Sequence, residues 1–169
     1  MRDATVVKRA VVGDEAALRE VRLQALRDAP EAFGSTLERE LARTDDDWRR
    51  WITPGATFIL LESGTARGLV AGSRREEDAA VVQLMAMWVD PALRGSGAAD
   101  ALVSALVGWA AAAGAREVRL RVVKRNDRAR RLYERHAFKT IGPDLIRPRD
   151  GVVEIEMQRT WLSNGELMV

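Results

Sequence analysis

Apolar residues follow two different periods along the chain, which predicts that strands and helices alternate. Alternating, β-branched segments predict strands at residues 4–12, 56–62, 68–74, 79–89, 117–123 and 152–160, with an extra strand considered near 138–141. Three- and four-residue spacings predict helices at residues 17–26, 44–51, 97–113 and 126–136. This order predicts a mixed α/β domain with one layer of sheet and helices on both faces.

The short helix near residue 44 has a recognisable start. Thr44 is a good N-cap residue, and the three aspartates at 45–47 follow it in the first turn, where negative charge favours the helix dipole. Trp48 and Trp51 then fall on one side of the helix. If Trp48 or Trp161 were exposed, either could serve a homodimer interface, whereas burial in the core is the ordinary alternative.

Composition limits the class of protein. The chain has 169 residues, of which 47% are hydrophobic, so we expect one domain spanning residues 1–169. No apolar run approaches the roughly 20 residues of a membrane span, and the N-terminus lacks the apolar core of a signal peptide. We therefore expect a cytoplasmic protein with no membrane partner. With no cysteine and one histidine, a thiolate nucleophile is excluded and a metal site is not expected.

Basic residues are concentrated late in the chain, although the net charge is only +2. The basic residues of this segment are Arg116, Arg119, Arg121, Lys124, Arg125, Arg128, Arg130, Arg131 and Arg135. Three acidic residues oppose them: Glu117, Asp127 and Glu134. A local anion site fits this pattern better than a broad nucleic-acid surface, so no nucleic-acid partner is expected.

The junction between residues 89 and 97 is the most specific local feature. A strand predicted to be buried ends at Val89, and a loop brings Arg94, Gly95, Ser96 and Gly97 just before a helix. Free N–H groups at a helix start can hold phosphate oxygens, and glycines let an anion approach. The alternative is a simple turn in which Ser96 caps the helix. The loop is neither a Walker motif nor a complete GxGxxG.

Two motifs at the right separation then carry a family resemblance. Residues 94–99, Arg-Gly-Ser-Gly-Ala-Ala, fit the (Q/R)-x-x-G-x-(G/A) signature of the GNAT superfamily of acetyl-CoA-dependent N-acetyltransferases. The pattern N-x-x-A-x-x-L-Y-E-x-x-G-F follows, with one departure. Its matching residues are Asn126, Ala129, Leu132, Tyr133, Glu134 and Phe138, with Ala137 in the place of the glycine. The N-terminal segments at 26–40 and 45–52 also resemble the acceptor-side helices of these enzymes.

The resemblance implies a fold and a cofactor site. The fold would be α/β (α+β), with a mixed, mostly antiparallel sheet of six or seven strands flanked by about four helices. Acetyl-CoA would be the co-substrate, and no metal would be needed. Its pantetheine and phosphates would contact Met87, Trp88, Val89, Arg94, Gly95, Ser96, Gly97, Ala98, Ala99, Asn126, Arg128 and Arg131.

The resemblance also assigns Tyr133 as the catalytic residue that protonates the leaving thiolate. A tyrosine of pKa about 10 is roughly matched to a thiol of pKa about 8.5. His136, three residues later, is interpreted as a helix-end residue rather than a partner in catalysis. If position 137 needs a left-handed backbone, alanine costs about 1 kcal/mol there; we expect a slightly altered helix exit.

The acceptor side is less defined by the sequence. A small-molecule amine is the leading acceptor; protein or peptide acetylation and a non-catalytic acyl-CoA-binding module are the alternatives. Residues 32–44 and 141–150, with Trp48 and Trp51, would build the acceptor pocket, in which Phe33 and Gln83 are substrate-binding candidates. Many relatives have a glutamate where this chain has Gln83, so no general base is assigned; Glu38, Glu40 and the aspartates at 45–47 are the acids considered.

Overall fold

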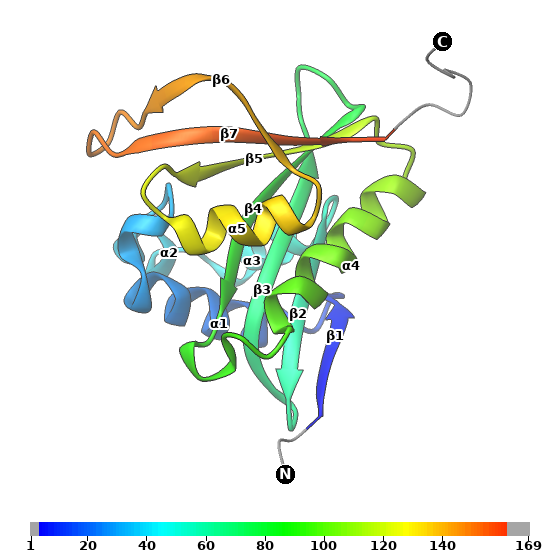
Figure 1. The fold of residues 1–169 in the computed structure, drawn as a ribbon. Helices are drawn as coiled ribbons and strands as arrows, with labels where there is room; N and C mark the ends of the chain where they lie inside the picture. The colour runs from blue at the N-terminus through cyan, green and yellow to red at the C-terminus, as the bar shows by residue number, and fades with distance from the viewer. Residues whose placement is uncertain (1–3, 162–169) are drawn as a thin grey trace.

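Seven strands form one sheet in the computed structural model, which describes residues 4–161 (Figure 1). The strands, in chain order, are β1 (Thr5–Arg9), β2 (Ala56–Glu62), β3 (Thr65–Arg74), β4 (Val81–Val89), β5 (Glu117–Val123), β6 (Lys139–Ile146) and β7 (Val153–Thr160). The helices are α1 (Glu15–Asp28), α2 (Leu37–Leu41), α3 (Asp45–Ile52), α4 (Ala98–Ala112) and α5 (Asp127–Arg135), with short 3-10 turns η1 (Pro30–Ala32) and η2 (Pro91–Leu93). The predicted α/β architecture with a mostly antiparallel sheet is confirmed.

The order of the strands is β1-β2-β3-β4-β5-β7-β6, and only β4 and β5 are parallel neighbours. A parallel pair needs a long crossover, which α4 provides. The pairing of β4 with β5 covers only Val81–Gln83 opposite Glu117–Arg119. Beyond Gln83 the two strands no longer pair, so the second half of β4 has one free edge.

Two hydrophobic cores hold the helices against opposite faces of the sheet. On one face, α4 contributes Leu102 and Leu106, both fully buried, to a core that also includes Leu132 of α5. On the other face, α1 and α3 pack with Leu18 and Trp48 in a second core. Burying such side chains is the main favourable contribution to folding. Trp48 is 1% exposed, so it offers no dimer surface.

β4 contains an irregularity near its centre. Leu69 and Ala71 of β3 pair with Trp88 and Met85 of β4, so β4 has one residue more than β3 over this stretch. The intervening Ala86 has φ 58°, which is uncommon for a residue other than glycine. A bulge of this kind bends a strand and redirects its side chains and backbone groups. It lies immediately before the segment predicted to contact pantetheine.

Several elements differ from the sequence predictions; β3, for example, begins at Thr65 and not at residue 68. The first strand is shorter than residues 4–12, α2 was not predicted, and the strand considered near 138–141 extends to Ile146. β6 is an edge strand that includes Gly142 and Pro143, and its register shifts between Ile141 and Leu145. Proline is tolerated at a sheet edge, but it obscures the alternation that identifies a strand. Across residues 4–161, every helix is too short or too polar to cross a lipid bilayer.

Candidate functional site

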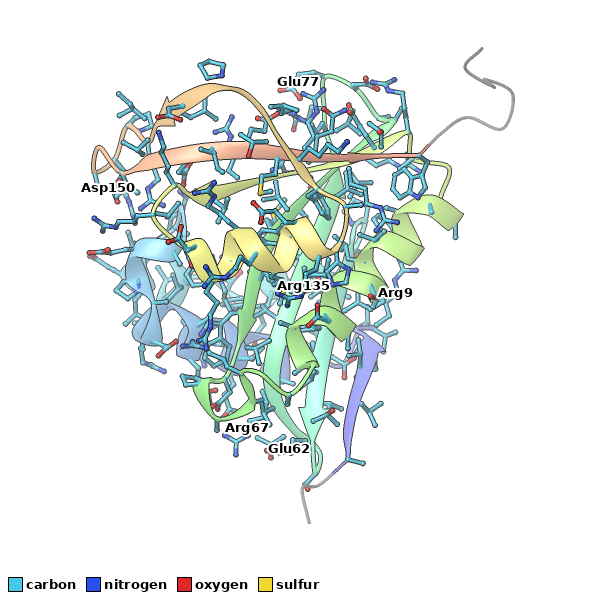
Figure 2. All side chains as sticks on the ribbon, viewed as in Figure 1. Arg9, Glu62, Arg67, Glu77, Arg135 and Asp150 are labelled. Atoms are coloured by element: carbon cyan, nitrogen blue, oxygen red, sulfur yellow. The ribbon has the colours of Figure 1, made fainter. Side chains whose placement is uncertain are left out.

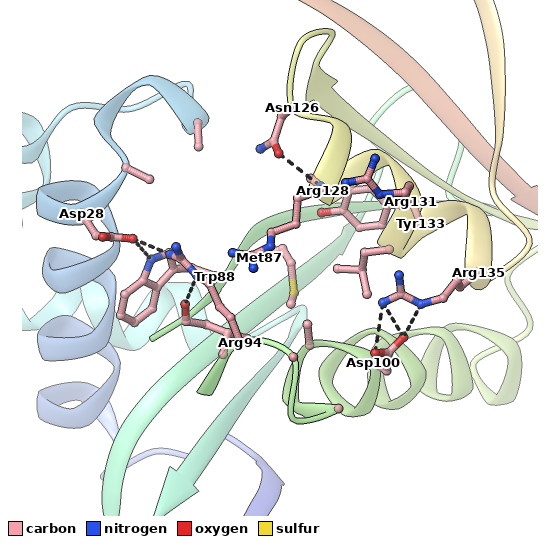
Figure 3. A pocket seen from close by; sticks show the side chains of 18 of the residues that line it. Asp28, Met87, Trp88, Arg94, Asp100, Asn126, Arg128, Arg131, Tyr133 and Arg135 are labelled. Carbon is pink, nitrogen blue, oxygen red and sulfur yellow. Dashed lines mark hydrogen bonds and ion pairs between the residues drawn. The ribbon is translucent and has the colours of Figure 1, made fainter. Parts of the chain in front are cut away.

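A cavity of about 680 Å³ lies between the end of β4, the start of α4, α5 and the end of α1 (Figure 3). It brings together most of the predicted cofactor residues, although they come from separate parts of the chain. The predicted residues that line it are Phe33, Met87, Trp88, Val89, Arg94, Gly95, Gly97, Ala99, Asn126, Arg128, Arg131 and Tyr133. Ser96 and Ala98 do not line it, and Gln83 lies elsewhere.

The free edge of β4 forms one wall of this cavity. Pairing with β5 ends at Gln83, whereas Met87, Trp88 and Val89 line the cavity further along the strand. Backbone N–H and C=O groups at such an edge need partners. An extended ligand with amide groups can supply them by adding to the sheet as another strand would.

The start of α4 is open to an anion. Gly97, with φ 89°, is its N-cap, and no side chain of the described residues caps this end. The alternative in which Ser96 caps the helix is wrong, because the Ser96 hydroxyl donates to the carbonyl oxygen of Leu93 at 2.5 Å. Gly95 also has a positive φ, 76°. The unpaired N–H groups and the helix dipole therefore remain available for phosphate oxygens.

α5 contributes two arginines to the cavity that make no ion pair with any residue of 4–161: Arg128 and Arg131. Arg130, between them in sequence, faces away and binds the backbone carbonyl of Lys124 at 3.3 Å. At the start of the helix, Asn126 accepts a hydrogen bond from the N–H of Ala129 at 3.1 Å. Its side chain is thus held at the rim of the cavity, as Figure 3 shows.

Asp28 joins the end of α1 to Trp88 of β4 and to Arg94 of the loop before α4, and it was not predicted as a site residue. Its carboxylate accepts from the Trp88 indole at 2.9 Å and from Arg94 at 2.6 Å, and Arg94 also donates to the Val89 carbonyl at 3.2 Å. The hydrogen bond from Trp88, together with Arg94, holds the pKa of Asp28 below its usual value despite burial. An ionised Asp28 therefore positions the Arg94 side chain. Nothing in the sequence pattern distinguishes this aspartate.

The backbone conformation at the end of α5 fixes the position of the Tyr133 ring. The N–H of Ala137 donates to Glu134 and that of Phe138 to Tyr133, both at 3.1 Å, which is a Schellman helix end. Ala137 has φ 62°, so the left-handed exit is kept and the expected alteration is not seen. The Phe138 ring packs edge-on against that of Tyr133, with centroids 5.8 Å apart.

The phenol of Tyr133 is 6% exposed, and its hydroxyl points into the cavity (Figure 3). Burial raises the pKa of Tyr133 well above its usual value, so the group keeps its proton at neutral pH. The nearby His136 is engaged elsewhere: its Nε2 lies 2.9 Å from Asp100 of α4. Arg135, labelled in Figure 2, binds the same carboxylate at 3.2 Å (Figure 3), so these two residues join the end of α5 to α4.

A second cavity, of about 820 Å³, adjoins the first along β4. It is lined by residues 83–86 of that strand, while Ala32 and Phe33 border both cavities. Gln83 and Trp51 line it, as do residues 145–149, which form the end of β6 and the beginning of the turn to β7. Gln83 therefore lies in the second cavity, away from Tyr133, whereas Phe33 lies where the two cavities meet.

Each acid considered as a general base is either bound by other protein groups or absent from the lining of both cavities. Glu40 is 1% exposed and binds Arg43, with Arg22 also within ion-pair distance. Burial would raise the pKa of Glu40, but hydrogen bonds and these two positive charges outweigh it and lower the pKa. Asp47 is held by the cap of α3 and by Arg50. Glu38 and the other two aspartates line neither cavity.

Arg22 is a site residue that the sequence could have revealed. It lies four residues from both Leu18 and Leu26, on the buried face of α1. A charged residue at a core position of a helix is rare unless it is paired or functional. Among the described residues, no group of three or more histidine, aspartate or glutamate side chains is arranged to hold a metal ion.

Comparison with known proteins agrees with this geometry. The model of the acetyltransferase (GNAT) family matches residues 22–138. A GCN5-related N-acetyltransferase from Kribbella flavida is 26% identical, with a TM-score of 0.75 over 94% of this chain and 98% of that one. No curated protein sequence matches significantly.

Two further solved structures share the fold at lower identity. The Salmonella typhimurium protein yncA, solved with its cofactor acetyl-CoA, is 18% identical, with a TM-score of 0.79 over 96% of this chain and 97% of that one. The PaiA N-acetyltransferase from Thermoplasma acidophilum, solved with coenzyme A, is 15% identical, with a TM-score of 0.73 over 94% and 99% of the two chains. Since the family model covers more than half of the sequence, the chain belongs to the GNAT family of acetyl-CoA-dependent acetyltransferases.

Proposed function

We propose that this protein transfers the acetyl group of acetyl-CoA to a primary amine of a small molecule, by direct attack in a ternary complex. The observation that carries the proposal is the meeting of two cavities at Phe33 and along β4. One cavity suits the cofactor and the other an acceptor, so both can be bound at once. Direct transfer needs no nucleophilic side chain, and the chain contains no cysteine.

The residues of the first cavity fit acetyl-CoA. The free edge of β4 offers backbone partners to the amides of pantetheine, and the uncapped start of α4 offers N–H groups to the pyrophosphate. Arg128 and Arg131 line the same cavity and have no ion-pair partner among the described residues, so either can bind a further phosphate. When bound, acetyl-CoA supplies a thioester whose acetyl group is the one transferred.

The proposed chemistry needs one proton donor. The neutral amine of the acceptor attacks the thioester carbonyl carbon, the C–S bond breaks, and the sulfur leaves as a thiolate. Tyr133 donates a hydrogen bond and then its proton to that sulfur. Because burial raises the pKa of Tyr133, it remains protonated until the negative charge develops. The proton lost by the amine passes to water, since every carboxylate that lines the two cavities among the described residues is already bound to an arginine.

The turn between β6 and β7 supports a small acceptor rather than a peptide. Arg147 donates to the carbonyl of Glu31 at 2.9 Å, and Arg149 donates to those of Phe33 and Ser35, each at 3.1 Å. These bonds tie residues 147–149 to the segment after α1 and narrow the second cavity on that side. A peptide substrate would need this end to be open.

The test is steady-state kinetics with a panel of amines and varied acetyl-CoA, following release of free thiol and confirming the acetylated product by mass spectrometry. We expect intersecting lines in double-reciprocal plots, as a ternary complex requires. Parallel lines would instead show an acetyl-enzyme. If acetyl-CoA binds but no amine, including short peptides, increases thiol release, the chain is an acyl-CoA-binding module and the proposal is wrong.

A further inference from the structure

The second cavity is strongly basic. Among the described residues it is lined by more than twice as many arginines as carboxylates. The arginines are Arg22, Arg39, Arg43, Arg50, Arg121, Arg147 and Arg149, and the carboxylates are Glu40, Asp47 and Glu154. Such an excess of positive charge attracts anions and repels cations. The acceptor must enter this electrostatic environment.

None of the three carboxylates is free to bind a second ammonium group. Glu40 is bound by Arg43, Asp47 by Arg50 at 2.5 Å, and Glu154 by Arg147 at 3.1 Å. A polyamine would therefore leave its additional positive charges without partners in a basic cavity. This argues against polyamines as acceptors.

Arg22 is the least compensated of the arginines. Its side chain is 6% exposed, and its nearest acid, Glu40, lies 3.6 Å from Nη2. The same carboxylate is shared with Arg43, so two guanidinium groups face one negative charge. The Nε and Nη1 atoms of Arg22 are buried and have no hydrogen-bond partner among the described residues. A buried charge with incomplete pairing is costly, and a second anion nearby would lower that cost.

The aromatic residues around Arg22 fix the orientation of its guanidinium. Its Cζ lies 4.7 Å from the centre of the Phe33 ring and 5.4 Å from that of Trp51. These contacts restrict the side chain to one position beside the cavity. Phe33 also borders the cofactor cavity, so an anion beside Arg22 would lie near the point where the two cavities meet.

Two exposed arginines line the same cavity and can add to the attraction. Arg39 forms no ion pair with any residue of 4–161, and Arg121 has only a weak one, with its Nε 3.9 Å from Glu156. Both add positive charge to the lining of the cavity, and neither forms a close ion pair with a residue of 4–161. Together with Arg22 they form a basic wall, defined here as Arg22, Arg39 and Arg121.

We propose that the acceptor amine also carries an anionic group, a carboxylate or a phosphonate, that Arg22 binds with help from Arg39 and Arg121. This rests on the proposed function, because it names the class of amine that the enzyme acetylates. The anion holds one end of the acceptor at the basic wall, and its amine then reaches past Phe33 toward the cofactor. Arg22 is a substrate-binding residue in this proposal, not a proton-transfer group.

The first test compares amines that differ only in the anion. The pairs are leucine and 3-methylbutylamine, phenylalanine and 2-phenylethylamine, and 3-aminopropylphosphonate and butylamine, with spermidine as a polycation. We expect kcat/KM to be roughly tenfold or more higher for the anionic member of at least one pair, since a charged hydrogen bond is lost without it. Comparison of the two amino-acid pairs with the phosphonate pair also shows which of the two anionic groups the enzyme prefers. Equal or better activity with neutral amines or spermidine would overturn the inference while leaving acetyl transfer established.

The second test assigns the preference to Arg22. Arg22→Gln should raise KM for the anionic acceptor roughly tenfold or more and leave KM for acetyl-CoA unchanged. The difference in kcat/KM between the anionic and the neutral amine of each pair should therefore become smaller. The matched control is Arg19→Gln, because Arg19 is an exposed arginine on the same helix that lines neither of the two cavities. Circular dichroism checks the fold. If Arg22→Gln does not fold, Arg39→Gln combined with Arg121→Gln should still reduce the preference.

A binding measurement keeps the inference testable without turnover. Calorimetry with the CoA complex compares N-acetylleucine with N-(3-methylbutyl)acetamide, and N-acetyl-3-aminopropylphosphonate with N-butylacetamide. We expect tighter binding of at least one anionic product, and loss of that advantage in Arg22→Gln. Equal binding within both pairs overturns the anion site, whether or not any amine is acetylated. Anion-dependent binding with no acetylation would instead contradict only the proposed function.

Discussion

At the scale of single residues, the position of Tyr133 depends on two residues that follow its helix, Ala137 and Phe138. Ala137 adopts the left-handed conformation that reverses the chain, and Phe138 then packs on the Tyr133 ring. The hydroxyl points into the cofactor cavity as a result. The resemblance implied the role of Tyr133, but only the structure shows how an alanine can replace the glycine of the motif without moving it.

Replacing Tyr133 with phenylalanine removes the proposed proton donor and keeps the ring that packs on Phe138. We expect kcat to fall roughly 100-fold or more, within the range of acid catalysis, and the affinity for acetyl-CoA to change little. Kinetics and CoA titration measure the two quantities. An unchanged kcat would remove Tyr133 from the mechanism.

Because Tyr133 is the only tyrosine of the chain, incorporated fluorotyrosine gives a single 19F resonance. That resonance should shift when CoA binds, since the hydroxyl faces the cofactor cavity. A resonance that does not respond would place the thiol of CoA elsewhere.

Replacing Ala137 with glycine should stabilise the protein, because glycine adopts φ 62° without the steric cost that alanine has there. Ala137 is exposed, so no packing is lost. We expect the free energy of unfolding to rise by about 1 kcal/mol in urea denaturation. Ala111→Gly, at an exposed helical position of α4, should lower it instead. A decrease at both positions would contradict the strain assigned to Ala137.

At the scale of elements, α3 shows most clearly how local residues determine where a helix begins. The Thr44 side chain accepts from the N–H of Asp47 at 3.2 Å, and Asp47 accepts from the N–H of Thr44 at 2.9 Å, which completes a capping box. The predicted N-cap is therefore confirmed. Trp48 and Trp51 stack on one side of the helix, with ring centroids 5.5 Å apart.

The cap predicts a pH dependence. Its hydrogen bonds, first that from the Thr44 backbone and then that from Arg50, lower the pKa of Asp47 to about 2. A carboxylate with a lowered pKa in the folded state stabilises the protein above its unfolded pKa, and this stability is lost as the pH falls through the folded value. Asp47→Asn should thus be less stable than the wild type at pH 7, and the difference should shrink between about pH 4 and pH 2.

Urea denaturation at several pH values measures this difference. Asp45→Asn is the matched control, because Asp45 lies in the same first turn but makes no capping bond. A difference for Asp47→Asn that stayed constant down to pH 2 would show that the carboxylate charge is not responsible.

Element boundaries were predictable where local chemistry decides them. The predicted limits of β2 and β5 match the structure. β2 is a nearly continuous apolar run, and β5 alternates between charged and apolar residues. α2 was missed because its five residues contain only two leucines and are otherwise charged. β6 was predicted too short because Gly142 and Pro143 interrupt it, and its pairing with β7 is a contact distant in sequence that no local pattern records.

At the scale of the whole molecule, the sequence could group most residues that line the first cavity but not those that line the second. The two motifs lie at the starts of two consecutive helices, α4 and α5, that are separated only by β5, so a short stretch of chain brings them together. The acceptor cavity is built instead from α1, the segment after it, β4 and the turn between β6 and β7. Contacts such as that of Arg147 with the Glu31 carbonyl join residues more than a hundred positions apart, which periodicity cannot show.

The short pairing between β4 and β5 has a consequence for dynamics. Three residue pairs are all that connect β1–β4 to the β5, β7 and β6 half of the sheet through strand hydrogen bonds. Amides of residues 84–89 that are not bonded to β3 should exchange with deuterium quickly in the free protein. Bound CoA should slow that exchange, and exchange in the centre of β2 should not change. The cofactor would then act as the missing strand, and its binding would stiffen the junction between the two halves of the sheet.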